Sequence, residues 1–158
     1  MYKERLLDEY MIPVCSPSLI NAEPPLKELE DISNHTLLHE YSTEDWARWL
    51  DKAGVKDINL KRGTIFSHTV MVLQAAIHGQ GIAMTYSILA KQEIGSGRLV
   101  APFDITLASA NAYDFVCPEG HEQKPRITAF KDWLKTTIEK ESENDPFRTA
   151  GRYIEADY

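Results

Sequence analysis

The sequence predicts an α/β fold in which strands and helices alternate along the chain. Two observations predict it. First, short β-prone runs alternate with segments whose apolar residues recur at helical spacing. Second, residues 61–84 contain, in order, a strand, an apolar helix, a glycine turn and a second strand, which is the pattern of a βαβ unit.

The helix of this central unit is predicted from the positions of its apolar residues. Val70, Leu73, Ala76 and Ile77 recur at helical spacing, so we expect a largely buried helix. Glycines follow at positions 79 and 81. The first can end the helix in a left-handed conformation, and the second lets the chain turn into the short strand 82–84.

The start of this helix is a candidate ligand site. Ser67 is the expected N-cap, because its hydroxyl can accept a hydrogen bond from an amide of the first turn. Residues 66–69 follow directly after a predicted strand, and ligands of open α/β sheets bind at the carboxyl ends of the strands. Free amides and the helix dipole would favour an anion such as a carboxylate.

The elements before this unit follow from local signals. The first strand is expected only near Tyr10, and Pro13 predicts that it lies at a sheet edge or ends there, because proline donates no ladder hydrogen bond. A short helix is expected over 24–32 and a strand over 36–39. A helix over 44–53 is predicted from the inward stripe of its apolar residues and from Gly54, with Ser42 or Thr43 as its cap. Residues 58–66 alternate as a strand would.

The elements after the unit continue the alternation. A helix over 87–94, strands over 98–103 and 112–117, and a helix over 127–138 are expected from their periodicity. Residues 139–158 have weak periodicity and are predicted to be a frayed tail, with a docking contact through its apolar residues as the alternative: Phe147, Tyr153 and Ile154. An alternating chain normally begins with its own βαβ unit, so the polar start suggests that half of one lobe is absent.

Composition excludes several classes of protein. A chain of 158 residues with 43% hydrophobic and 26% charged residues is typical of globular domains. A net charge of −7 with dispersed Lys and Arg argues against direct DNA binding by this chain. No run approaches the ~18 apolar residues of a membrane span, and the start lacks the apolar core of a secretion signal, so a cytoplasmic location is expected. Cys15 and Cys117 are expected to be buried, reduced thiols.

Catalytic and metal-binding motifs were not found. The chain has no GxSxG, P-loop or HExxH motif, and the glycines at 79 and 81 do not complete a GxGxxG. His35 and His39 have the spacing of two helical metal ligands, but they bracket a predicted strand, so zinc is not expected. Neither enzymatic activity nor a cofactor is predicted.

Five segments carry a resemblance to a known family. They are PVCSPSL at 13–19, HTLLHE at 35–40, FSHTVMVLQAAIHGQGIA at 66–83, GRLVAPF at 97–103 and the closing FVC at 115–117 with the helix after it. Together they resemble the effector-binding domain of LysR-type transcriptional regulators over residues 6–138. The resemblance implies a two-lobed fold like a type 2 periplasmic binding protein, with mixed sheets. The winged helix-turn-helix that binds DNA in that family has no counterpart in this chain.

The resemblance also implies a division of the chain. Residues 1–14 and 111–142 would be a remnant of the first lobe, residues 15–110 the second lobe and residues 143–158 a tail. Many family members carry a proline shortly after the strand that follows the glycine turn. This chain has Thr85-Tyr86-Ser87 there, which would make that wall of the cleft more polar or differently shaped.

The ligand contacts implied by the resemblance lie in two segments. One holds Thr64, Phe66, Ser67 and His68, and the other is the loop around Ser42 and Trp46. Each has a purely structural alternative. The serines can be helix caps alone, His68 can be a solvated first-turn residue, and a tryptophan on the inward face of a helix is more often a core residue than a cleft wall.

Three hypotheses for function remain open at this stage. The first is a sensor that binds an amino acid or other carboxylate between two lobes and shifts the balance between conformations of a regulator. The second is a solute-binding module of a transporter, which has the same fold. The third is a truncated, non-functional regulator. An incomplete lobe would expose sheet edges and apolar faces, so we expect a homo-oligomer that covers them.

Overall fold

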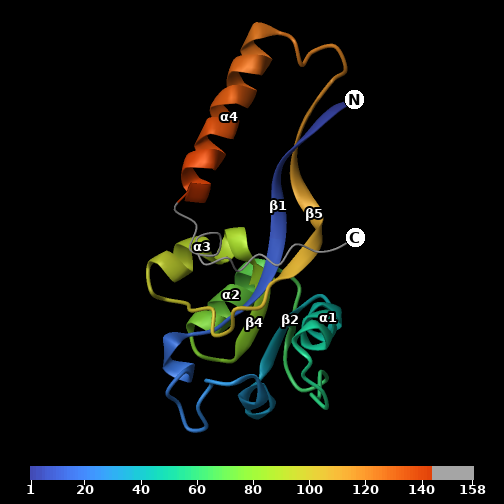
Figure 1. The fold of residues 1–158 in the computed structure, drawn as a ribbon. Helices are drawn as coiled ribbons and strands as arrows, with labels where there is room; N and C mark the ends of the chain where they lie inside the picture. The colour runs from blue at the N-terminus through green and yellow to red at the C-terminus, as the bar shows by residue number, and fades with distance from the viewer. Residues whose placement is uncertain (144–158) are drawn as a thin grey trace. The chain divides into compact units, whose positions relative to one another are not determined.

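The computed structural model describes residues 1–143, which hold one sheet of five strands in the order β3-β2-β4-β1-β5 (Figure 1). Contacts between residues divide the chain into two compact units. Unit 2 is residues 10–107. Of the described residues, unit 1 comprises 1–9 and 108–143. Strand β1 (Tyr2–Val14) has residues in both units, and β5 (Leu107–Cys117) lies almost wholly in unit 1.

The three shorter strands of unit 2 are parallel. In β2 (Leu37–Glu40), His39 pairs with Ile65 of β3 (Ile65–Phe66), and Leu38 pairs with Ala83 of β4 (Ile82–Tyr86). The end of β1 runs antiparallel to β4. Parallel strands bring their carboxyl ends to the same edge of a sheet, so residues 40, 66 and 86 end at one edge.

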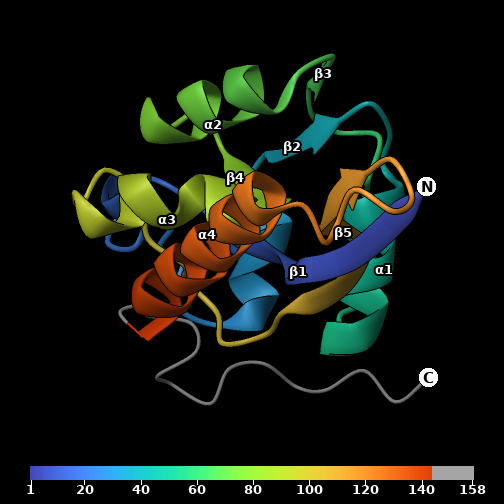
Figure 2. The same ribbon diagram turned by 90° about the horizontal axis from the view of Figure 1, so that it is seen from above.

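Helices cover both faces of these strands because successive strand residues point to opposite sides. Helix α2 (Thr69–Ile77) packs on β2 and β4, and α3 (Ser87–Gly95) on β4. Helix α1 (Glu44–Ala53) lies on the other side of β2 from α2 (Figure 2). The core on the α1 side is built around two fully buried tryptophans, Trp46 and Trp49, packed with Leu37, Ile82 and Met84.

Two glycines form the turn that connects α2 to β4 in the central βαβ unit. Gly79 has a φ of 73° directly after α2, the left-handed conformation that glycine adopts without steric cost. A Cβ on Gly81 would lie 2.3 Å from the carbonyl oxygen of Thr36, so only glycine lets this turn lie against the chain entering β2. The predicted roles of both glycines are confirmed.

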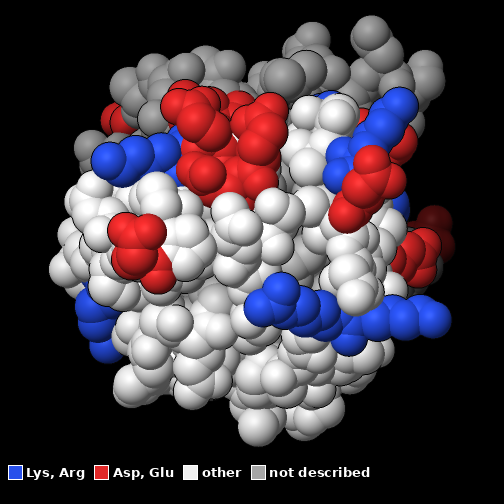
Figure 3. All heavy atoms as spheres, turned by 90° about the horizontal axis from the view of Figure 1, so that it is seen from below, with Lys and Arg blue, Asp and Glu red and all other residues white. Residues whose placement is uncertain are grey.

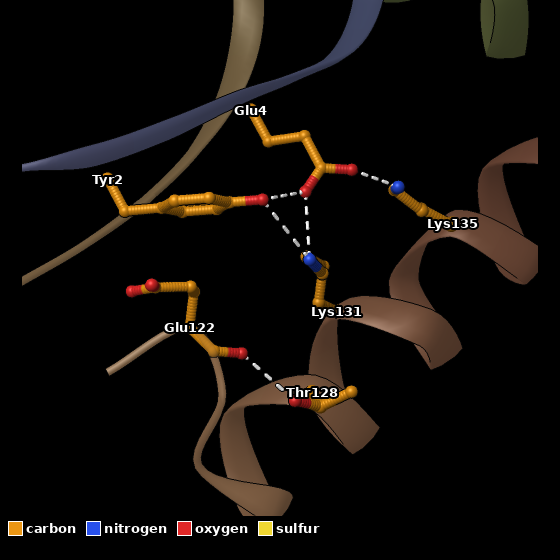
Figure 4. Close-up of polar contacts among 6 residues, drawn as sticks. All are labelled: Tyr2, Glu4, Glu122, Thr128, Lys131 and Lys135. Atoms are coloured by element: carbon orange, nitrogen blue, oxygen red, sulfur yellow. Dashed lines mark hydrogen bonds and ion pairs between the residues drawn. The ribbon is translucent and has the colours of Figure 1, made fainter. Parts of the chain in front are cut away.

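Unit 1 is held together by charge and by aromatic packing. Glu4 of β1 accepts hydrogen bonds from Lys131 and Lys135 of α4 (Pro125–Glu143) and from the hydroxyl of Tyr2 (Figure 4). The Lys131 ammonium also lies 5.2 Å from the centre of the Tyr2 ring. Phe115 of β5 packs against Phe130, 6.5 Å between ring centres. No residue of α4 is buried, so this helix contributes little to a core.

Several predicted elements are confirmed with small changes of boundary. Residues 36–39, 44–53, 82–84, 87–94, 112–117 and 127–138 form β2, α1, β4, α3, β5 and α4. Gly54, at φ 73°, ends α1 as expected. Cys15 and Cys117 are buried free thiols, as predicted. Burial raises the pKa of the Cys15 thiol to about 12.

Other expectations were wrong. β1 begins at Tyr2, not near Tyr10. Of the two alternatives for Pro13, the sheet edge is wrong, because β1 lies between β4 and β5, and the strand end is confirmed, because β1 ends at Val14. The helix expected over 24–32 is replaced by the 3₁₀ helix Leu29–Asn34, and a second 3₁₀ helix, Pro17–Leu19, precedes it. A strand was expected over 58–66, but only its last two residues form one, β3. A strand was also expected over 98–103, but this segment forms only a single bridge, from Val100 to Cys15.

The remaining expectations concern α2 and the end of the chain. Val70 was expected on the buried stripe of α2 but is 68% exposed, because Val72 and Ala75 face the sheet in its place. Residues 139–143 belong to α4, which corrects the predicted start of the tail. The docking contact through Phe147, Tyr153 and Ile154 lies outside the described residues.

Candidate functional site

The candidate site lies at the edge of unit 2 where the parallel strands end. Glu40 closes β2, Phe66 closes β3, and the chain then enters α2. The backbone fixes these ends firmly: the amide of His39 donates to the carbonyl of Thr64 (3.0 Å), and that of Tyr41 to the carbonyl of Phe66 (2.9 Å). These bonds hold the ends of β2 and β3 side by side, directly before the chain enters α2.

The N-terminus of α2 is capped differently from the prediction. His68, not Ser67, is the N-cap, and its side chain makes no capping hydrogen bond. Ser67 Oγ instead lies 2.9 Å from Nδ1 of His68. Ser67 lies one residue before the N-cap position. That position belongs to His68, whose backbone is extended (φ −149°, ψ 136°) directly before the first helical residue. Both side chains are exposed. The amide of Met71 donates to the carbonyl of His68 (3.0 Å), so the amides of α2 without a partner in the helix are those of Thr69 and Val70.

A carboxylate of the protein lies at this helix start. Glu40 is half-buried, and its Oε1 accepts a hydrogen bond from Oγ1 of Thr69, the first residue of α2. The interaction places a negative charge at the positive end of the helix dipole, which is a stabilising arrangement. Sequence reasoning missed Glu40 because the strand was expected to end one residue earlier, at 39. The signal that could have found it is its position as a charged residue directly at the carboxyl end of a buried strand.

Further carboxylates gather at the start of α1. Burial raises the pKa of Asp45, and the neighbouring Glu44 and Glu40 raise it further, while Arg48 lowers it. The edge of the sheet next to α1 is therefore acidic. An acidic edge favours ligands or ions that carry positive charge.

Ser42 acts as a cap of α1. It is exposed, and its Oγ accepts a hydrogen bond from the amide of Glu44 (3.3 Å), while the N-cap Thr43 makes no such bond. The predicted capping role for one of these two residues is thus confirmed for Ser42. Its contact with a ligand stays a prediction, and the two roles are compatible.

Trp46 is a core residue. Its side chain is 1% exposed, its Nε1–H donates to the carbonyl of Leu38 (3.0 Å), and its ring packs edge-on against Trp49, 5.6 Å between centres. A buried indole whose only donor is already used has nothing to offer a ligand. Of the two interpretations that the sequence left open, the structure supports packing, and the contact of Trp46 with a ligand stays a prediction.

The other predicted contacts do lie together. Thr64, Ser67 and His68 are exposed and Phe66 is half-buried, all within five residues at the edge of β3 and the start of α2. They surround the same helix N-terminus as Glu40. The structure therefore brings together four of the six predicted residues, adds Glu40, and leaves Ser42 on the neighbouring loop.

His35 and His39, whose spacing resembled that of two metal ligands, have different surroundings in the structure. His39 is buried in β2, and burial lowers the pKa of its imidazole. His35 lies with Nε2 3.1 Å from the carbonyl of Pro25. Among the residues that the structure describes, no group of three His, Cys, Asp or Glu side chains is placed to hold a metal ion.

The surface charge of the visible face is mixed. In Figure 3, Asp and Glu side chains form a group near the top, while Lys and Arg side chains lie in several places and do not cover the face. Binding to the phosphate backbone of a nucleic acid requires a continuous basic face.

Within residues 1–143, no helix combines the length and the apolar character needed to cross a bilayer.

Comparison with known proteins is consistent across sequence and structure. Residues 1–139 match the model of the LysR substrate binding domain. The chain is 46% identical over 145 residues to the glycine cleavage system transcriptional activator of Escherichia coli K12, covering 92% of this chain and 48% of that protein. It is 37% identical over 142 residues to the homologue of that activator in Haemophilus influenzae, covering 90% of this chain and 46% of that protein.

The fold is shared with solved effector domains. The AmpR effector domain of Pseudomonas aeruginosa gives a TM-score of 0.70 at 22% identity, covering 89% of this chain and 66% of that one. The AmpR effector binding domain of Citrobacter freundii gives 0.71 at 25% identity, covering 88% and 68%. The chain spans about half the length of the curated relatives it matches.

Proposed function

The chain belongs to the family of LysR substrate-binding domains, and on that premise we propose that it senses a small metabolite, an amino acid or other carboxylate. Its relatives are transcriptional regulators and not enzymes. That finding favours a sensor over the transporter module considered from sequence.

One observation carries the proposal. The exposed start of α2 gathers helix amides, Ser67 and His68 at the carboxyl edge of parallel strands. Amides at a helix N-terminus bind carboxylates and other anions, and this edge is where ligands of α/β sheets bind. The residues that hold the effector in this proposal all belong to unit 2. They are Ser42, Thr64, Phe66, Ser67 and His68.

The role of the whole protein is part of the same proposal. In it, unit 2 corresponds to the second lobe, residues 15–110, and residues 1–14 and 111–142 to part of the first. A longer protein would bind DNA through an N-terminal winged helix-turn-helix, act in the cytoplasm as a homo-oligomer, and change its conformation when the effector binds. The effector shifts that equilibrium only by the difference between its affinities for the two conformations.

Ligand-dependent stability of the 158-residue chain tests the proposal. Amino acids, purines and small carboxylates are screened by thermal unfolding, and hits are titrated by calorimetry. A ligand at a hundred times its Kd stabilises the folded state by about 2.7 kcal/mol, which raises Tm by several degrees. Ser67→Ala and His68→Ala are expected to weaken binding.

Ser33→Ala is the matched control, because Ser33 is also exposed and its hydroxyl donates to a main-chain carbonyl remote in sequence from α2. It is expected to leave binding unchanged. Absence of any stabilisation across the panel would contradict the proposal, as would equal effects of Ser67→Ala and Ser33→Ala on a ligand that does bind.

A further inference from the structure

One histidine of unit 2 is buried without hydrogen-bond partners for its ring. His39 lies in β2 and is 1% exposed. Within the described residues, neither Nδ1 nor Nε2 of this ring makes a hydrogen bond. The carbonyl of Leu60 lies near the imidazole without completing one. A neutral imidazole can be buried in this way at modest cost, whereas an imidazolium would be a buried charge with no partner.

A loop without helix or strand covers this histidine. We call residues 55–64 the covering loop. A Cβ on Gly63 would lie 3.2 Å from Nε2 of His39 and would collide with the main-chain carbonyl of Leu37, so the loop approaches β2 more closely than any other residue at position 63 would permit. The amide of His39 also donates to the carbonyl of Thr64, 3.0 Å away, at the end of the loop.

The charged residues on the surrounding elements do not compensate a charge on the ring. Glu40, the next residue of β2, points to the opposite face of the sheet, and β3 and β4 carry no charged residue. The others are exposed or half-buried: Asp57, Lys61 and Arg62 on the covering loop, and Asp45 and Arg48 at the start of α1. Of these described residues, none contributes to the pKa of His39, which burial lowers and the carbonyl of Leu60 raises by less.

The covering loop leads directly into the candidate site. It ends at Thr64, and Phe66 of β3 follows two residues later. The hydrogen bond from the amide of His39 to Thr64 is one of those that hold β2 and β3 side by side. Movement of the loop away from His39 would therefore displace residues that are proposed to contact the effector.

We propose that the covering loop closes only over a neutral His39, and that protonation of His39 opens the loop and weakens effector binding. The part on effector binding rests on the proposed function, whereas the part on the loop does not. Burial lowers the pKa of His39, so the closed form binds fewer protons than the open form. Closure is therefore complete above the ordinary value near 6.5 and is lost as the pH falls below it.

Hydrogen exchange of single amides, measured by NMR on the full 158-residue chain without ligand, tests the loop. The reporters are the amide of His39, bonded to Thr64, and that of Arg62, bonded to the carbonyl of Asn59. Rates at pH 7.5 and pH 5 are converted to protection factors, which removes the intrinsic pH dependence of exchange. Both factors should fall several-fold to about thirtyfold at pH 5, because an exposed imidazole titrates near 6.5. Amides of α1 serve as the internal reference and should keep theirs.

Histidine variants assign the effect to one residue. His39→Leu removes the titrating group and fills its place with an apolar side chain, so both protection factors should become independent of pH while Tm stays equal or rises. His39→Gln is a second neutral variant, for use if the leucine does not fit. His78→Leu is the matched control, because His78 is an exposed histidine of the same unit and its loss should leave the pH dependence intact.

A glycine variant opens the loop without acid. Gly63→Ala adds the Cβ that collides with the carbonyl of Leu37, so the two reporter amides should lose protection already at pH 7.5. Gly97→Ala is its control. Gly97 also has a positive φ, 76°, but a Cβ there would meet nothing within 4 Å, so the reporter amides should be unaffected.

The outcomes separate this inference from the proposed function. If the protection factors do not fall at pH 5, or fall equally in the His39 variants, the inference is wrong and the sensor function stands. A ligand found by the screening panel should lose more affinity at pH 5 in the unmodified chain than in His39→Leu, and equal losses would also refute the inference. If nothing in the panel binds, the proposed function fails together with the part on effector binding, and exchange alone decides the part on the loop.

Discussion

At the scale of single residues, the structure separates side chains that build the fold from those that remain free for a ligand. Trp46 and Ser67 were both candidates for ligand contact, yet Trp46 is buried with its donor used and Ser67 is exposed at a helix start. Sequence spacing placed Trp46 correctly on α1, and it placed the cap of α2 one residue too early, at Ser67 instead of His68. It could not decide between core and cleft for the tryptophan, because that depends on what packs against the helix.

Replacing Trp46 by phenylalanine should destabilise unit 2. The substitution leaves the buried carbonyl of Leu38 without its donor and removes part of the ring that packs on Trp49. We expect a loss of about 2 kcal/mol in the free energy of unfolding, measured by urea denaturation with an unchanged slope.

Trp133→Phe is the control for this measurement. Trp133 is 60% exposed, so the same change there should alter the free energy of unfolding by less than about 0.5 kcal/mol. Equal losses in the two variants would show that the indole of Trp46 has no special structural role.

At the scale of elements, apolar helices with clear ends were predicted well, and polar or irregular segments were not. The start of β1 was missed because charged residues alternate along it, a half-exposed pattern, and its pairing in the sheet decides its conformation. Residues 58–66 alternate as a strand does, yet most of this segment has no strand partner. The site was found through α2, whereas the place of Glu40 in it became clear only from the hydrogen bond that its carboxylate accepts from Thr69.

The contact of α4 with β1 should respond to acid. Hydrogen bonds from Lys131 and Lys135 to Glu4 lower the pKa of this carboxyl group to about 2 in the folded chain, from an ordinary value near 4.5. Its folded pKa lies below its unfolded one, so its stabilising effect is complete above about pH 4.5 and is lost as pH falls towards 2.

Glu4→Gln isolates this effect. Other carboxylates also titrate in acid, so the quantity to compare is the change in urea midpoint between pH 5 and pH 2.5 for the two proteins. The unmodified chain should lose more stability over this interval than Glu4→Gln. Identical pH dependence would mean that the ion pairs of Glu4 contribute nothing in solution.

At the scale of the whole molecule, the two units differ in how they are stabilised. Unit 2 contains the buried cluster around its tryptophans, whereas α4 in unit 1 has no buried residue. Phe130 and Trp133 are 53% and 60% exposed and stack on each other, 5.8 Å between ring centres. Exposed aromatic surface of this kind is typical of faces that another polypeptide covers.

Self-association should therefore depend on α4. Light scattering with size exclusion at increasing concentration is expected to show dimers or larger species of the 158-residue chain, and the double variant Phe130→Glu/Trp133→Glu should shift them towards monomer. The control, Val70→Glu/Met71→Glu, adds the same charge at an exposed apolar pair on α2. A monodisperse monomer at all concentrations, or equal shifts in both double variants, would refute this expectation.

The burial of both native cysteines has a practical consequence for spectroscopy. Neither thiol is accessible to a maleimide dye in the folded chain. The substitution Ser67→Cys would therefore create a single labelling position next to the N-terminus of α2. Fluorescence from that single dye would then report binding and release of a ligand in real time, and neither native cysteine would have to be replaced.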